Sequence, residues 1–505
     1  MKRLLSDAAA RAWLVVALVG AVVVVLVIAL QLIPRLTGAQ KLIDDADPAL
    51  TDARVAGDRV GIDFISKLVD TADPLVTAQG GGAGEVGGLI GVVSRKTGLS
   101  SAQILAVLKQ EAPHTTALLQ ALPLSDVTAE RPGLITFLAK TLKLSENDTQ
   151  GALKQSFPRL WQTLLAAPPV TDGWNDIPGL NGMTRFDGTT PVKSVPEVRD
   201  YFSKDLVAAV EANRADFQKV ADKGGVGYIP WLLLVVGDVV LAFGLLMATR
   251  AATRPPGRGP WGVVVLVGVV ILGLVLVLSY YPRLDAADKV ITNLEPAFAK
   301  QRTAGDAAGI AMVHQIILFS DPLMTAKGGG SDEVPKLVKF VAGKTGLSSA
   351  AVLAALQKNA PKTTAVLQAI PLEAVSAEIP HLLDVLATTL KATKDEVQAT
   401  LTSSTPGLAQ TLNSVTPVTS GWDAIPGTER LTRFNGTPVT TATALDDYFR
   451  EDVIPVLPRQ RAHFDKLANT WPPVTYFPPL LMVVGLLVVL YGVFGMLVLS
   501  KKPEA

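Results

Sequence analysis

Few residues in this chain have the type and spacing that catalysis or metal binding requires. The sequence contains four histidines, His114, His314, His381 and His463, and no cysteine. The lack of cysteine excludes disulfides, thiolate metal ligands and cysteine nucleophiles. The histidines show no ligand spacing such as HExxH, so we predict no metal site and expect structural or surface roles for all of them.

Nucleophilic and nucleotide chemistry is not indicated either. The sequence has no GxSxG elbow, no Walker A motif and no GxGxxG fingerprint. Glycine triplets at 80–82 and 328–330 lack the Lys-Ser/Thr of a phosphate-binding loop, so we interpret them as flexible connectors. Asp73 and Asp321 each precede a proline, which is more typical of a helix end or turn than of a glycosidase carboxylate pair. The sequence therefore predicts a non-enzymatic protein without catalytic residues or a cofactor.

One ionisable residue occupies an energetically costly position. Asp238 lies near the centre of an apolar segment, where an Asp costs about 3 kcal/mol while about eleven Leu, Val and Phe neighbours return about 0.3–0.6 kcal/mol each. The segment should still insert into a membrane. Asp238 is the candidate intramembrane polar site, either in structure and assembly, for example through a hydrogen bond to Tyr491 or Ser279, or in proton or ion handling.

Asp238 belongs to one of four apolar segments of about 20 residues, the length that crosses a bilayer core. With 49% hydrophobic and 18% charged residues, the chain is too apolar for a soluble protein, and a net charge of +1 gives no reason to expect nucleic acid. The first segment ends in the same Pro-Arg-Leu as the third, so we expect an anchor and not a cleaved signal peptide. The predicted transmembrane helices are 12–33, 229–249, 261–281 and 477–499.

Basic residues in the short flanks set the expected orientation. They are Lys2, Arg3, Arg11, Arg250, Arg254, Arg258, Lys501 and Lys502. Short basic flanks stay on the cytoplasmic side. We therefore predict a multi-pass protein of the bacterial cytoplasmic (inner) membrane, with both termini inside. The predicted cytoplasmic segments are 1–11, 250–260 and 500–505, and the predicted extracytoplasmic domains are 34–228 and 282–476.

Identities at a constant offset of 248 residues indicate an internal repeat. The segments KTGLSS, GW and TRF at 96–101, 173–174 and 184–186 recur at 344–349, 421–422 and 432–434. Agreement over most of each half indicates a tandem duplication of one helix–domain–helix unit. The halves are then parallel repeats about a pseudo-twofold axis along the membrane normal.

Periodicity within each half predicts an all-α fold with a helical stalk and a head of helix pairs. Apolar residues seven apart, at Leu36, Ile43 and Leu50, indicate a heptad seam. Further along, Ser100 with Gln103 forms a capping-box pattern, and a proline then starts the next helix of each pair. The sequence leaves open whether stalk and head are separate or form one compact bundle.

One irregular region in each half, Pro168 to Pro196 and its twin from Pro417, supplies candidate recognition loops. Their candidate residues are Trp174, Arg185, Phe186, Trp422, Arg433 and Phe434. Trp and Arg are favoured interface anchors. The alternative is that the aromatic residues fill the domain core while each Arg pairs with a local carboxylate.

These features favour a cell-envelope scaffold, assembly factor or accessory subunit that acts through protein–protein interaction of its two outer helical domains. The expected partners are the lipid bilayer and either an envelope protein or a second copy, with a lipid ligand as a further candidate. The alternative is transport or export of a lipid or other small molecule, with Asp238 in the membrane path. A sensor without its own output domain, and last an envelope hydrolase, are weaker hypotheses.

Overall fold

The computed structural model describes residues 8–48, 50–221, 227–251, 253, 257–277, 280–468 and 476–499. Across those ranges the regular structure is helical and no strand is assigned, which confirms the predicted all-α fold. Two isolated bridges, Thr184–Pro191 and Thr432–Pro438, lie in matching loops. Ser279 and parts of the predicted cytoplasmic segments 1–11, 250–260 and 500–505 lie outside the described residues.

The chain forms two compact units, and each takes residues from both halves of the sequence. The first, here called the hairpin unit, comprises Met1–Thr51, Ala209–Ala299 and Val456–Ala505. The second, here called the head unit, comprises Asp52–Ala208 and Lys300–Pro455. The predicted domains 34–228 and 282–476 are therefore sequence segments whose helices are shared between both units.

The hairpin unit contains four apolar helices and the shorter helices that follow or precede them. The apolar helices are α2 (Ala8–Ala29), α13 (Ile229–Ala251), α14 (Arg258–Val277) and α25 (Phe477–Phe494). The others are α3 (Leu32–Ala46), α12 (Val207–Ala221), α15 (Tyr280–Leu294), η3 (Glu295–Phe298), α24 (Val456–Ala468) and η7 (Gly495–Leu499). Helix α2 ends before the predicted boundary at residue 33, because Gln31 adopts a left-handed conformation with φ of 49° and separates α2 from α3.

Glycines set the packing of each apolar hairpin, in which α2 packs on α13 and α14 packs on α25. A Cβ on Gly20 would lie 2.4 Å from the Leu241 nitrogen, and one on Gly244 would lie 2.4 Å from the Ala17 nitrogen. Gly268, at the position that matches Gly20, meets α25 in the same way. Small residues thus let the backbones approach closely, as in membrane helix pairs, and they fix which face of each helix points outward.

Among the described residues, five helical segments are long and apolar enough to cross a membrane, and the bent pair Gly330–Thr345 and Ser349–Asn359 would be a sixth if it formed one span. Four are α2, α13, the segment that begins with α14, and α25; the fifth is α16 (Lys300–Met324). In α16, 56% of the apolar window is buried inside the chain, against 27–39% in the other four. Helix α16 is therefore a core helix of the head unit.

The head unit is built from matching series of helices. The first half supplies α4 (Asp52–Val76), η1 (Ala78–Gly80), α5 (Gly82–Thr97), α6 (Ser101–Glu111), α7 (Pro113–Ala121), α8 (Leu124–Leu142), α9 (Glu146–Ser156), α10 (Pro158–Gly173), α11 (Val195–Asp200) and η2 (Tyr201–Leu206). The second supplies α16, η4 (Ala326–Gly328), α17 (Gly330–Thr345), α18 (Ser349–Asn359), α19 (Pro361–Ala369), α20 (Leu372–Leu390), α21 (Lys394–Ser404), α22 (Pro406–Gly421), α23 (Ala442–Asp447) and η5 (Tyr448–Val453). The predicted capping box of Ser100 and Gln103 is present, and Pro113 starts α7 as expected.

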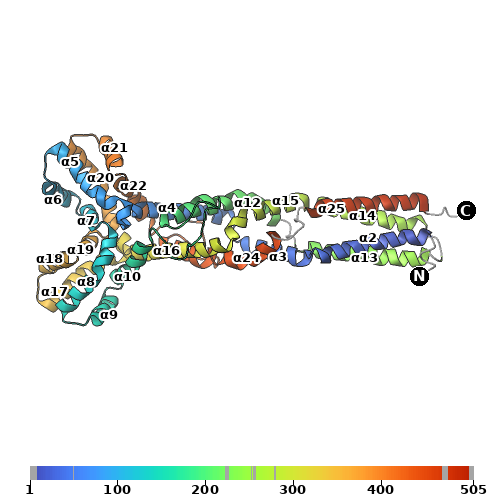
Figure 1. Cartoon of the computed structure of the whole chain (residues 1–505), viewed down its shortest axis with the longest axis horizontal. Coiled ribbons are helices and arrows are strands. Elements are labelled where there is room, and N and C mark those ends of the chain that lie inside the picture. Colours follow the sequence, from blue (N-terminus) through green and yellow to red (C-terminus); the bar gives the residue numbers. More distant parts are fainter. Residues whose placement is uncertain are drawn as a thin grey trace. The chain divides into compact units, whose positions relative to one another are not determined.

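The two halves exchange helices inside the head unit, which the sequence did not predict. Helix α4 packs on α22, α10 packs on α16, and α7 packs on α19. Figure 1 shows α5 and α6 grouped with α20 and α21, and α8 and α9 grouped with α17 and α18. One such core joins Val93 and Leu108 of the first half to Leu386 and Leu401 of the second. Neither half therefore closes its own core within this unit.

Glutamates from one half cap helices of the other. Glu378 accepts hydrogen bonds from the backbone nitrogens of His114 and Thr115, at 3.1 and 2.8 Å. Its counterpart Glu130 accepts from Lys362 and Thr363, at 3.0 and 2.8 Å. Carboxylates at helix N-termini satisfy unpaired N–H groups and oppose the helix dipole. These contacts, here called exchanged caps, therefore stabilise α7 and α19 through side chains of the opposite half.

A second set of exchanged caps holds α10 and α22. Glu333 accepts from the Arg159 and Leu160 nitrogens, at 3.2 and 2.9 Å. Glu85 makes the matching contacts with the nitrogens of residues 407 and 408, at 3.1 and 2.8 Å. Glu333 is only 8% exposed. All four exchanged caps join residues far apart in the chain, so they fix the arrangement of the halves as well as the helix ends.

The glycine triplets form tight turns, so the predicted flexible connectors are wrong. A Cβ on Gly80 would lie 2.1 Å from the Asp73 carbonyl oxygen, and one on Gly82 would lie 2.3 Å from that of Pro74. Between them Gly81 has a φ of +87°, which strains other residues. The triplet at 328–330 makes the same contacts with the end of α16. Glycine is required here because the chain turns back against its own helix.

Candidate functional site

The tryptophans of the predicted recognition loops lie in the core. Trp174 is 0% exposed and its Nε1 donates to the Asp73 carboxylate at 2.7 Å. Trp422 is 1% exposed and donates to Asp321 at 3.0 Å. The two Asp-Pro carboxylates therefore have a structural partner, and neither tryptophan presents a surface to a ligand in this structure.

The loop arginines pair with local carboxylates. Arg185 donates through Nε and Nη2 to Asp205, at 2.5 and 2.6 Å, and the Phe186 backbone nitrogen donates to the same carboxylate. Arg433 forms the same bidentate pair with Asp452, at 3.0 and 2.9 Å. The Asp205 carboxylate raises the pKa of the Arg185 guanidinium. This arrangement corresponds to the structural alternative for the loops.

Each loop is also contacted by an arginine of the opposite half, which sequence reasoning missed. Arg54 of α4 donates to the Thr432 and Arg433 carbonyl oxygens, at 3.1 and 3.0 Å, and lies 5.0 Å from the Phe434 ring centroid. Arg302 of α16 does the same with the 184–186 loop and lies 5.3 Å from the Phe186 ring. Their spacing of 248 residues was the available signal.

Beside each of these arginines lies an acid that faces a tyrosine; Asp306 is fully buried and Asp58 is half-buried. Burial raises the pKa of Asp58 to about 7, although the Tyr448 hydroxyl and Arg54 lower it in part. Asp306, which faces Tyr201, has its pKa raised to about 7 for the same reason. Among the residues that the structure describes, neither tyrosine hydroxyl makes a hydrogen bond of good geometry. The carboxyl groups of Asp58 and Asp306 thus have pKa values near neutrality within a packed helix interface.

Close to these clusters, the correspondence between the halves breaks down. His314 Nδ1 lies 2.6 Å from the Asp446 carboxylate, whereas the matching positions carry Ser66 and Arg199. Arg199 forms ion pairs with Asp70 and with the neighbouring carboxylate at position 200. Burial raises the pKa of Asp446, while His314 lowers it in part. The same place in the fold thus holds a histidine–acid pair in one half and an arginine–acid cluster in the other.

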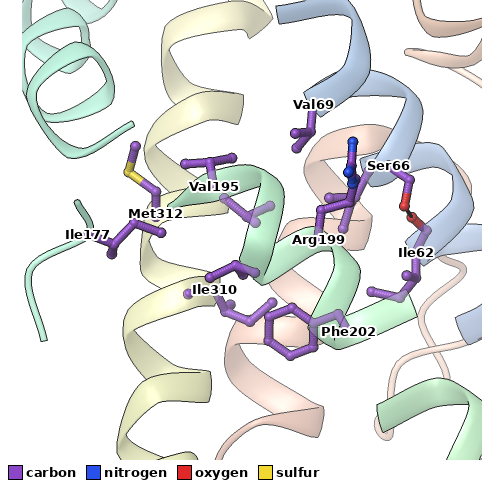
Figure 2. Close-up of a pocket in the computed structure, with 13 residues that line it drawn as sticks. Ile62, Ser66, Val69, Ile177, Val195, Arg199, Phe202, Ile310 and Met312 are labelled. Atoms are coloured by element: carbon purple, nitrogen blue, oxygen red, sulfur yellow. Dashed lines mark hydrogen bonds between the residues drawn. The ribbon is translucent and has the colours of Figure 1, made fainter. Parts of the chain in front are cut away.

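A small cavity lies between α4, α11 and α16 (Figure 2). Its lining includes Ile62, Phe202, Ile310 and Met312, together with Arg199. The cavity volume is about 10 Å³, which is about the space of one water molecule. Two further apolar cavities in the head unit measure about 50 and 60 Å³. These spaces are far below the roughly 300 Å³ of a small-molecule site.

Asp238 points outward from the hairpin unit. Its side chain is exposed, while its neighbour Gly237 is buried against α2. It makes no hydrogen bond or ion pair with any residue in the described ranges. The predicted hydrogen bond to Tyr491 is wrong, because the Tyr491 hydroxyl donates to the Ala12 carbonyl oxygen at 2.9 Å. Ser279, the other predicted partner, lies outside the described residues.

An apolar groove of about 400 Å³ lies among the four apolar helices. Valine and leucine side chains of α2 and α25 form most of its lining, together with Val240, Val264 and Tyr491. Asp238 does not line it. Its size and aliphatic composition suit a hydrocarbon chain, and the hydroxyl of its Tyr491 donates to the Ala12 carbonyl oxygen.

No group of three or more His, Asp or Glu side chains that could hold a metal ion occurs in the described part of the chain. The comparisons with known proteins add no assignment: no family model, no curated protein and no solved structure matches this chain.

Proposed function

We propose that this chain is a multi-pass protein of a bacterial cytoplasmic membrane, with four spans, both termini inside and the head unit outside. The exposed faces of α2, α13, α14 and α25 support this topology, because they carry valine and leucine almost throughout. The basic residues of the short flanks support the orientation. Helix α16 is left out of the spans because it is a core helix of the head unit.

Within that topology, the chain acts as a scaffold or accessory subunit for another envelope protein. The observation that carries this proposal is the set of four exchanged caps, Glu85, Glu130, Glu333 and Glu378, which hold the halves of the head unit together. Charged hydrogen bonds at four helix starts favour one fixed arrangement of the helices. The three cavities described in the head unit are far smaller than a small-molecule site, which favours binding at its surface.

Transport is the second candidate, and the apolar groove is the observation that favours it. A volume of about 400 Å³ lined by aliphatic side chains suits an acyl chain. Asp238 lies outside the groove, so a path that uses both is not supported. A lipid held in the groove fits a scaffold equally well, because a bound acyl chain would fill the space between the hairpins.

Cysteine labelling tests the topology directly, because the native chain has no cysteine. Single cysteines replace Ser403 in the head unit and Gly259 in the first turn of α14, and both positions are exposed. In intact cells a membrane-impermeant maleimide should label the first variant and not the second. The opposite pattern would contradict the orientation, and equal labelling in both would contradict the spans.

Native mass spectrometry of the full chain, extracted in mild detergent from its own membrane, tests the scaffold. A stoichiometric complex with one envelope protein is the expected result. Recovery of the chain alone or with lipid only, in several detergents and after crosslinking in the intact membrane, would overturn the scaffold proposal and favour transport.

A further inference from the structure

The outward position of Asp238 is fixed by the packing of its own helix. Gly237 and Gly244 place one face of α13 against α2, where an added Cβ on Gly244 would lie 2.4 Å from the Ala17 nitrogen. Because successive residues of a helix are about 100° apart, this contact leaves Asp238 on the exposed side. Its neighbours there, Val235 and Val239, are 61% and 56% exposed. Turning Asp238 inward would require breaking the glycine contacts.

The predicted membrane spans offer no cation to this carboxylate. The segments 12–33, 229–249, 261–281 and 477–499 contain neither lysine nor arginine. A second copy of the chain would therefore bring only another Asp238 to the same depth. Charged groups within a bilayer are paired or face a polar environment, so a basic side chain from a different membrane protein is the complementary partner.

The matching face of the other hairpin carries no acid. Position 486, which corresponds to Asp238, is a leucine that is 51% exposed. Around it, Val483 and Leu487 correspond to Val235 and Val239 and are 57% and 59% exposed. The two outward faces thus have similar apolar surroundings and differ at the central residue. A partner that recognises the carboxylate would therefore bind the outward face of α13 and not that of α25.

We propose that the Asp238 face of α13 docks one transmembrane helix of another membrane protein, and that this helix carries a lysine or arginine at the depth of Asp238. This proposal rests on the proposed function and names the chemistry of its membrane partner. Ala242, one turn beyond Asp238 and also exposed, leaves room for a close approach of that helix. The expected stoichiometry is one partner helix per chain.

Model transmembrane peptides test the charge requirement. The probe is a 21-residue Leu/Ala helix with one central lysine, and its control has leucine at that position. Each is reconstituted with the full-length chain in phosphatidylcholine vesicles, and association is measured by energy transfer from a fluorophore on the chain. We expect the lysine peptide to bind about tenfold more tightly than the control, as a single polar contact between membrane helices would give.

Substitutions in the chain test whether Asp238 causes the tighter binding of the lysine peptide. Asp238→Leu should abolish it, and Asp238→Asn, which keeps hydrogen bonding without charge, should remove most of it. Adding Leu486→Asp to the Asp238→Leu chain should restore it on the other hairpin. Unchanged glycine-packed hairpins, monitored by a crosslink between α2 and α13, show that the variants fold. A preference that survives Asp238→Leu, or equal binding of both peptides, would overturn the proposal.

Crosslinking in the native membrane distinguishes the Asp238 docking proposal from the scaffold proposal. A photoreactive residue at Val235 should crosslink to a membrane protein whose span contains Lys or Arg, and the matched residue at Val483 should not. A crosslink between two copies of the chain, or equal yields at both positions, contradicts the proposal. If the complex seen by native mass spectrometry persists with Asp238→Leu, the scaffold stands and this inference fails; if the unaltered chain has no protein partner, the scaffold itself fails.

Discussion

The head unit and the hairpin unit use the correspondence between the two sequence halves in different ways. In the head unit, the polar contacts come in matching pairs, such as Glu130 with Glu378 and Trp174 with Trp422, and each pair stabilises the interior. In the hairpin unit, the glycine contacts match, but the outward faces carry Asp238 in one hairpin and Leu486 in the other. Contacts that hold the fold are shared, while the outward residue differs.

The same contrast occurs inside the head unit on a smaller scale. The clusters of Asp58 and Asp306 match each other in their raised pKa values and in their tyrosine and arginine neighbours. A short distance along the same helices, Ser66 corresponds to His314, and the ion pairs differ. Matching residues therefore identify positions that packing requires, and unmatched polar residues identify positions where the halves have separate roles.

The largest effect is expected from the core tryptophans. Trp174→Ala removes a fully buried ring and leaves the Asp73 carboxylate without its donor, so it should destabilise the head unit by about 3–5 kcal/mol. Trp422→Ala should cost a similar amount, because its contacts match. Chemical denaturation of the full chain in detergent, followed by hydrogen exchange in α4 and α10, measures both. Unchanged stability would contradict a core role for these tryptophans and would favour a role in recognition.

Loss of an exchanged cap should have the next largest effect. Glu378→Ala removes charged hydrogen bonds at the start of α7 and should cost about 2 kcal/mol, as should Glu130→Ala at α19. Exposed Asp395, in the first turn of α21, provides a control whose change to Ala should cost less than about 0.5 kcal/mol. The same denaturation experiment applies. Costs equal to that of the control would mean that the exchanged caps do not hold the head together.

The buried acids should make stability depend on pH. Their folded pKa values of about 7 exceed the unfolded value, so the folded state binds more protons between about pH 4 and pH 7. The stability contributed by protonated Asp58 and Asp306 is therefore lost as the pH rises through this range. We expect a loss of about 1–2 kcal/mol for Asp58, less than the full linkage value because its side chain is only partly buried, and a larger loss for Asp306, which is 0% exposed.

The double variant Asp58→Asn/Asp306→Asn isolates this contribution. The difference in unfolding free energy between native chain and variant should decline from pH 4 to pH 7 and stay level above that. The many surface carboxylates titrate equally in both proteins, so they cancel. A difference that rises with pH would show that both acids are ionised in the folded head and paired with Arg54 and Arg302.

The smallest effect is expected at the loop phenylalanines. Phe434 is 36% exposed and lies over Arg54, so Phe434→Ala should cost only about 1 kcal/mol. Phe186→Ala, in the matching contact with Arg302, should cost slightly more because Phe186 is less exposed. Partner binding and unfolding free energy should both be measured for the two variants. A large loss of binding for Phe434→Ala alone would give that loop a recognition role.

Helix types and ends could be predicted from sequence because they depend on neighbours a few residues away. The capping box of Ser100 and the prolines that start α7 and α10 occur as predicted. Apolar length predicted α2, α13, α14 and α25 as spans, and they are candidates in the structure. Composition alone also qualifies α16, whose burial depends on helices far away in the chain.

The glycine triplets and the recognition loops show where local patterns failed. Sequence alone does not decide whether Trp174 and Arg185 belong to the core or to an interface, because tryptophan and arginine are typical of both kinds of contact. The sequence of 80–82 predicts a flexible connector, because the Asp73 carbonyl oxygen that excludes a side chain there comes close only once α4 and α5 pack together. The exchanged cap of Glu130 reaches Lys362, 232 residues away, and no local pattern encodes such a distance.

By itself, the sequence determined that this chain is helical, apolar enough for a membrane, and built from matching halves, because helix propensity, capping and hydrophobic length are local properties. The tertiary structure alone decided that the halves exchange helices and caps, that the loop residues fill a core, and that Asp238 faces outward. Those outcomes depend on which backbone surfaces fit together, and close packing at glycines such as Gly237 and Gly244 fixes them only once the helices meet.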